Sequence, residues 1–231
     1  MDTEIVISNS ITSLISFTVF FISYRIYSHT EGASLAYKKW AIGTFLSFLA
    51  VLMYLLIGLI GSDNFSSKFI AIKDIIGNLL ISLGYFYFPI GIMYLSKDIG
   101  IGTVNEVTIK KIQKIFFGFI FLLCVSLAFT ISFKDIKNES RIFFNTLYSI
   151  IWVFTISRYS QVYPTLKQIT NNRCWTLLYV GIIGAFLNDF FTVIDCLTGT
   201  SLFYIILASQ LMMAIGIIFA FFMLAKMLNI L

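Results

Sequence analysis

The stretch Gly181-Ile-Ile-Gly-Ala-Phe-Leu-Asn-Asp-Phe-Phe-Thr-Val-Ile-Asp195 decides how this chain is read. It lies in a long apolar run that is typical of a membrane-spanning helix. Residues three, four and seven apart share a helix face, so Gly181, Asn188 and Asp195 belong to one small and polar stripe. The other members of that stripe are Gly184, Ala185 and Thr192, and the opposite side is expected to carry Ile182, Ile183, Phe186 and Phe190. An acid inside a membrane costs several kcal/mol and is a functional-site hypothesis by default. We therefore expect this helix to line the site of the protein.

The composition places the chain among integral membrane proteins. Of its 231 residues, 59% are hydrophobic and only 12% are charged, and the mean hydropathy is +0.93. A soluble domain averages about 25% charged residues. The net charge of +5 comes from bases in short loops, where they set orientation and do not indicate a nucleic-acid partner.

The apolar runs predict an all-α, polytopic membrane protein with seven transmembrane helices in one domain, residues 1–231. The expected spans are residues 5–26, 41–60, 75–95, 115–133, 142–163, 175–197 and 202–228. With the N-terminus outside, eleven of the sixteen basic residues fall on the inner side. The positive-inside rule therefore predicts an N-out, C-in orientation. No linker is long enough to hold a soluble domain.

Polar side chains recur in the predicted outer half of the membrane. Most spans carry one helix face with amide, hydroxyl or acidic groups, and these faces could line an outward-facing pocket with aromatic walls. The residues expected to bind a ligand are Asn188, Asp189, Asp195, Asn78, Tyr85, Asn145, Trp152 and Gln210. Asp189 lies about 100° around the helix from Asn188 and needs a partner of its own. The alternative is that these side chains only bond across helix contacts, at about 1 kcal/mol each.

Several chemistries lack the residues that they require. The single histidine, His29, lies in an inner loop, and no cluster of metal-ligating side chains is visible. A retinal protein needs a lysine in the middle of its seventh span, whereas Lys226 lies at the inner end. We expect no metal, no cofactor and no enzyme activity.

Three segments resemble the seven-helix sensor modules of microbial signalling proteins. These are Tyr37-Lys-Lys-Trp-Ala41, Leu83-Gly-Tyr-Phe-Tyr-Phe-Pro-Ile-Gly-Ile92 and Arg173-Cys-Trp-Thr-Leu-Leu-Tyr-Val-Gly181, which leads to Asn188 and Asp189. The resemblance implies an N-out module with short loops. We expect a copy of this kind to stand alone, without the usual output domain, and therefore to signal through a membrane or cytoplasmic partner.

A shorter stretch resembles another family. Tyr24-Arg-Ile-Tyr-Ser-His-Thr-Glu-Gly-Ala-Ser-Leu-Ala-Tyr37 is similar to the end of the first span in SWEET and PQ-loop sugar transporters. This resemblance implies two three-helix halves joined by a connector helix, with the solute between the halves. Such transporters use an asparagine in the third and the seventh span; Asn78 matches the first, and the seventh span offers Gln210 instead.

The first interpretation is a receptor-like sensor in the cell membrane that binds a small or lipid-like ligand from outside and signals through a partner. The alternatives are a facilitative transporter of sugar-like solutes and a structural subunit of a membrane complex.

Overall fold

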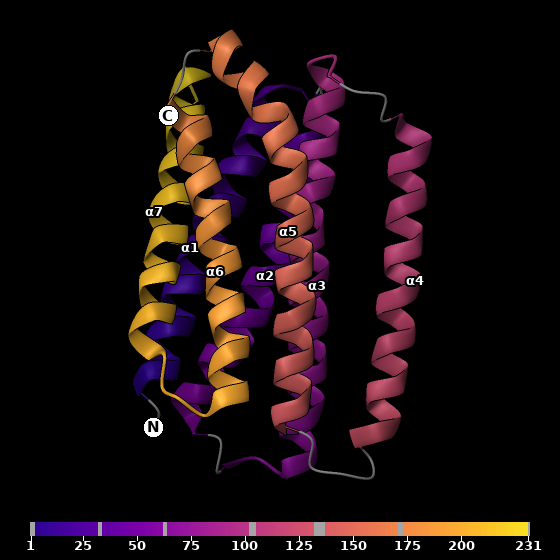
Figure 1. The fold of residues 1–231 in the computed structure, drawn as a ribbon, viewed down its shortest axis with the longest axis vertical. Helices are drawn as coiled ribbons and strands as arrows, with labels where there is room; N and C mark the ends of the chain where they lie inside the picture. The colour runs from indigo at the N-terminus through magenta and orange to yellow at the C-terminus, as the bar shows by residue number, and fades with distance from the viewer. Residues whose placement is uncertain are drawn as a thin grey trace.

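A computed structural model describes residues 3–31, 34–61, 64–101, 105–131, 137–170 and 173–230. These residues form helices only, so the predicted all-helical fold is confirmed for the described part of the chain (Figure 1). The helices are α1 (Thr3–His29), α2 (Leu35–Ile60), α3 (Ser67–Asp98), α4 (Glu106–Ile131), α5 (Lys137–Thr170), α6 (Arg173–Thr198) and α7 (Phe203–Met227). The expected fourth span, 115–133, ends outside the described residues.

Six helices close a ring in the order α1, α2, α3, α5, α6, α7, because each of them packs against the next and α7 packs against α1. In the described residues α4 packs on α3, and it stands to one side of the bundle in Figure 1. Neighbouring helices in the chain run in opposite directions, so α1, α3, α5 and α7 point the same way.

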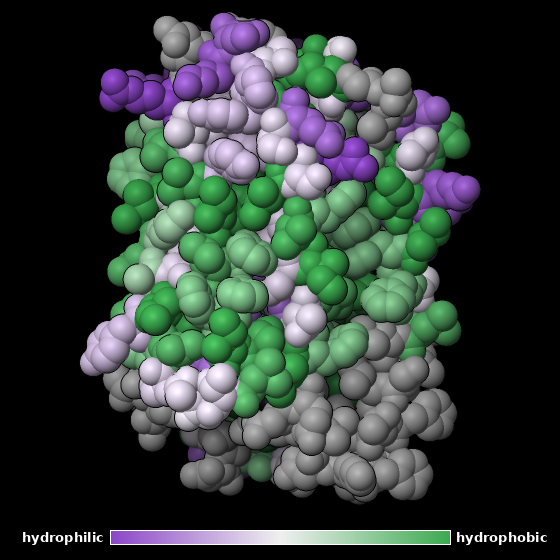
Figure 2. Space-filling view, viewed as in Figure 1, coloured by the Kyte–Doolittle hydropathy of each residue, from purple (hydrophilic) through white to green (hydrophobic). Residues whose placement is uncertain are grey.

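Among the described residues, five helices are long and apolar enough to cross a membrane. The qualifying segments are Asn9–His29, Leu35–Ile60, Ile72–Asp98, Arg173–Thr198 and Phe203–Met227. Helix α5 is continuous, but its apolar sequence is interrupted by charged side chains, among them Arg158 and Lys167. Apolar side chains cover the middle of the face seen in Figure 2, and polar side chains gather at the end where α3 ends and α6 begins. This distribution is typical of a protein whose middle lies in lipid.

Glycines bring the helices of two neighbouring pairs into close contact. A Cβ atom on Gly43 of α2 would lie 2.6 Å from the carbonyl oxygen of Gly84 in α3. A Cβ atom on Gly216 of α7 would collide with the backbone nitrogen of Gly181 in α6. Only glycine leaves room for backbones this close, as expected for small residues at helix crossings in membranes.

Trp40 fills the centre of the ring. Its side chain is 1% exposed, and its indole N–H donates to the Phe88 carbonyl oxygen at 3.1 Å. The indole ring of Trp40 also packs edge to face against the Phe221 ring of α7, with 5.4 Å between the ring centroids. One aromatic side chain from α2 therefore links α3 and α7.

Candidate functional site

The buried side of α6 is broader than the predicted stripe. The buried residues of α6 include four members of the stripe, as expected: Gly181, Gly184, Ala185 and Thr192. Asp189 is buried as well. Ile182, which was expected on the side opposite the small stripe, is also buried, with its side chain 0% exposed. The helix is covered from two directions, with α7 against the glycines and α5 against the neighbouring face.

Asp189 lies inside the bundle and is 3% exposed. Its Oδ1 atom accepts a hydrogen bond from Nδ2 of the neighbouring Asn188 at 3.0 Å. Within the described part of the chain, Oδ2 of Asp189 and Oδ1 of Asn188 are buried and meet no donor at hydrogen-bonding geometry. The pair therefore keeps two buried acceptor atoms that can take a proton or a donor.

Aromatic side chains from α3 and α5 form the wall opposite Asp189. The Trp152 indole lies against the Asp189 carboxyl group, and the Tyr85 hydroxyl interacts electrostatically with it. The rings of Tyr85 and Trp152 pack together with 4.9 Å between centroids, and Phe88 packs on Trp152 at 5.3 Å. The indole N–H of Trp152, 1% exposed, also meets no acceptor at hydrogen-bonding geometry among the described residues.

Tyr148 completes this wall, and it was not among the predicted residues. Its hydroxyl lies 3.0 Å from Oδ1 and 3.1 Å from the backbone carbonyl oxygen of Asn78. Its ring meets Tyr85 edge to face at 5.2 Å. The signal was present in the sequence, because Tyr148 precedes Trp152 by four residues and therefore shares its helix face.

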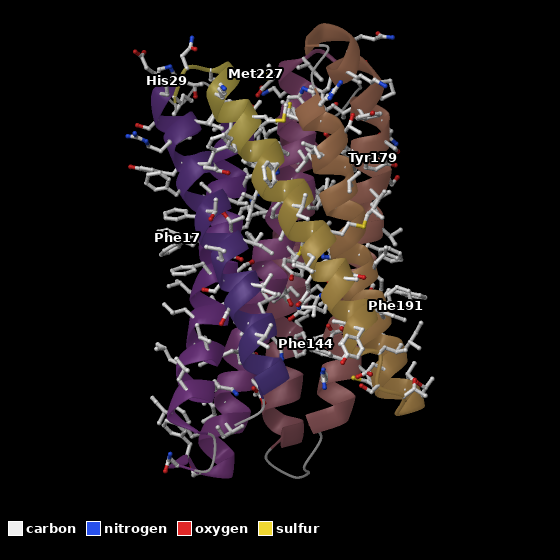
Figure 3. The ribbon with its side chains drawn as sticks, turned by 90° about the vertical axis from the view of Figure 1, so that its left-hand side faces the viewer. Phe17, His29, Phe144, Tyr179, Phe191 and Met227 are labelled. Carbon is white, nitrogen blue, oxygen red and sulfur yellow. The ribbon has the colours of Figure 1, made fainter. Side chains whose placement is uncertain are left out.

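These contacts define a polar–aromatic cluster on three helices: Asn78 and Tyr85 of α3, Tyr148 and Trp152 of α5, and Asn188 and Asp189 of α6. Figure 3 labels Phe144, which precedes Tyr148 by one turn of α5, and Phe191, which follows Asp189 by two residues in α6. Both lie in the half of the bundle opposite His29 and Met227. Five predicted ligand-binding residues thus come together.

The other predicted residues take different roles. Asp195 lies near the end of α6, and its Oδ1 atom accepts from the backbone N–H of Leu202 at 2.9 Å. Asn145 donates from Nδ2 to the carbonyl oxygen of Arg141 in its own helix, at 2.8 Å. Gln210 is 5% exposed on α7, next to Ser209, which lies at the Gly184 crossing.

A small hollow lies away from the cluster, between α6 and α7, and is too narrow to hold a water molecule. Its lining consists of Cys174, Trp175, Leu178, Ala220, Phe221 and Leu224. The described residues also contain no group of three His, Cys, Asp or Glu side chains able to hold a metal ion. The cluster is thus an enclosed acid with aromatic and amide neighbours.

In the part of the chain that the structure describes, the fold defines a class: an all-helical bundle with five helices long and apolar enough to cross a membrane. No model of a known protein family matches the chain, and neither a curated protein nor a solved structure matches it.

Proposed function

We propose that the chain is a receptor-like sensor that crosses the membrane seven times, with the N-terminus outside and the C-terminus inside. The bias of basic residues toward one side supports this orientation. The polar–aromatic cluster then lies in the outer half, where a small or lipid-like ligand can reach it from outside or from the lipid. The sensor acts through a partner at the inner face and catalyses no reaction.

One observation carries this proposal: the cluster joins α3, α5 and α6 around a buried acid, and the hollow between α6 and α7 leaves no room for a water molecule. A sensor needs a site whose occupation changes how helices pack. A transporter needs a water-accessible route on each side of its site. The closed packing and the three-helix junction favour the sensor.

The same helices offer a route for the signal toward the inner end. There the Tyr159 hydroxyl of α5 donates to the Trp175 carbonyl oxygen of α6 at 2.8 Å. One turn further along α5, the Tyr163 hydroxyl lies 3.0 Å from the Thr176 hydroxyl. Because both ends of the α5–α6 contact are tied by side chains, a change at Trp152 and Asp189 shifts the two helices together.

Thermal unfolding of the purified protein in the presence of a library of small and lipid-like compounds tests the sensor. We expect at least one compound to raise the melting temperature of the wild type, and Asn188→Ala to lose that shift. Tyr204→Phe is the control, because Tyr204 is 83% exposed on α7. In parallel, uptake of labelled monosaccharides into proteoliposomes should be absent. Uptake that disappears in Asn78→Ala and Asn188→Ala would replace the sensor by a transporter.

The transporter is the second candidate because the ring divides into two matching halves. Helices α1, α2, α3 and α5, α6, α7 follow each other in the same order and direction, with α4 outside the ring. Gly43 and Gly181 are each the ninth residue of their helix, counted from Leu35 and Arg173. Each meets a glycine of the following helix. Parallel repeats around an axis along the membrane normal are a known transporter plan.

A further inference from the structure

The side chains around Asp189 supply hydrogen-bonding groups but no positive charge. From α5 come the Tyr148 hydroxyl and the Trp152 indole, and from α3 comes the Tyr85 hydroxyl. Helix α7, the other neighbour of α6, carries no titratable side chain between Tyr204 and Lys226. In the described residues no lysine, arginine or histidine nitrogen lies within 4.0 Å of the Asp189 carboxyl group. The titratable groups that face Asp189 are therefore two phenols.

An ionised carboxylate in this place would be poorly compensated. It would hold one hydrogen bond, from Asn188, and its other oxygen would be buried without a donor at hydrogen-bonding geometry. Burying an uncompensated charge costs several kcal/mol even after the protein relaxes. A neutral carboxylic acid avoids this cost, because its O–H group needs only an acceptor.

A proton is the positive charge that the closed bundle can accommodate. A metal cation or an organic ammonium group needs room and several oxygen ligands, whereas the side chains around Asp189 are packed against each other and the acid is 3% exposed. We propose that Asp189 is a proton-binding site, protonated in the described packing of α5 and α6 and ionised when the two helices shift against each other. The inference does not depend on an external ligand and so goes beyond the sensor function.

The chemical step is a simple dissociation. The O–H bond of the Asp189 carboxylic acid breaks, the proton passes to water, and the electron pair stays on the carboxylate. The charged group then requires donors, and the buried indole N–H of Trp152, which lies against the carboxyl group and meets no acceptor at hydrogen-bonding geometry among the described residues, can supply one. Because Trp152 belongs to α5, a hydrogen bond from its indole to the carboxylate changes the fit of α5 on α6. Proton binding and helix packing are therefore linked.

Infrared spectroscopy of the purified full chain in lipid vesicles tests the proposal. The pH chosen is 7, which is about three units above the ordinary pKa of aspartate. At this pH we expect the wild type to show a carboxylic-acid C=O band, and we expect Asp189→Asn to lose it. Asp195→Asn is the matched control, because Asp195 belongs to the same helix but caps a loop, and it should keep the band. A band missing from the wild type at pH 7, or still present in Asp189→Asn, would overturn the proposal.

A second variant covers the case in which Asp189→Asn does not fold. Asp189→Glu keeps the acid, and it should retain a carboxylic-acid band at a shifted frequency; an unshifted band would assign the signal to another residue. The tryptophan emission of the wild type should change when alkaline pH removes the band. Trp152→Phe should lose that change while keeping the band at pH 7. If emission stays constant while the band disappears, proton release and helix packing are not linked.

Discussion

The hydroxyl of Tyr148 lies 3.0 Å from the side-chain oxygen of Asn78 and joins α5 to α3 directly. The backbone carbonyl oxygen of Asn78 lies 3.1 Å from the same hydroxyl, so a single donor faces two acceptors. Because α3 and α5 belong to the two different halves of the ring, this contact holds the halves together on one side.

Tyr148→Phe removes this bond and keeps the ring contact with Tyr85. We expect the free energy of unfolding to fall by about 1 kcal/mol, the usual value of one interhelical hydrogen bond. Denaturation in mixed micelles measures the change. Tyr204→Phe, at an exposed position on α7, is the control, and equal stability of the two variants would show that the Tyr148 bond contributes nothing.

The glycine crossing between α6 and α7 should be intolerant of a single methyl group. In Gly216→Ala the new Cβ atom would collide with the Gly181 backbone nitrogen, so the helices must move apart. Overpacking of this kind costs about 1–3 kcal/mol, which thermal unfolding should reveal. Gly118→Ala on α4 is the matched control, since a Cβ atom there meets nothing within 4 Å. Alanine favours a helix by up to about 1 kcal/mol over glycine, and Gly118→Ala should therefore not destabilise. A Gly216→Ala protein as stable as the wild type would contradict the close crossing.

The sequence predicted the helices well because long apolar runs leave little choice of secondary structure. It also identified Asn188 and Asp189 as unusual, because polar groups are rare in such runs. It could not show which helix faces Asp189, since the partner depends on the order of helices in the ring. Tyr148 was overlooked although it shares a helix face with Trp152, and the burial of Ile182 was not expected, because α6 is covered by two neighbours.

Asp195 illustrates the same limit. Near a helix end an acid can bind a ligand or accept a backbone N–H, and the sequence does not distinguish the two. In the structure it accepts from Leu202 at 2.9 Å. We expect Asp195→Ala to speed hydrogen exchange of the Leu202 amide, whereas Asp195→Asn keeps an acceptor and should change it little. Exchange that is the same in Asp195→Ala and in the wild type would contradict the cap.

The first turn of α4 should loosen in acid. Glu106 lies 2.8 Å from Lys110 and 3.3 Å from Lys97 of α3, and these hydrogen bonds lower its pKa below the ordinary 4.5. A lowered pKa means that the folded state favours the carboxylate. The contribution of Glu106 to the stability of the folded state is therefore present above pH 4.5 and is lost as the pH falls through the lowered pKa. Hydrogen exchange corrected for the intrinsic rate should show residues 106–110 less protected below that pH. Glu106→Gln should be less protected already at neutral pH, and a pH effect that persists in Glu106→Gln would assign it to another group.

The orientation can be tested at two loops that the N-out arrangement places on opposite sides. Asn64 lies between α2 and α3, and Asn105 lies between α3 and α4. In a chain whose native cysteines are replaced by serine, Asn64→Cys should react with a membrane-impermeant maleimide in intact cells. Asn105→Cys should react only after permeabilisation, because its loop adjoins the basic residues Lys110 and Lys111. The reverse pattern would invert the orientation and move the cluster to the inner half. Equal labelling of both sites in intact cells would mean that α3 does not cross the membrane.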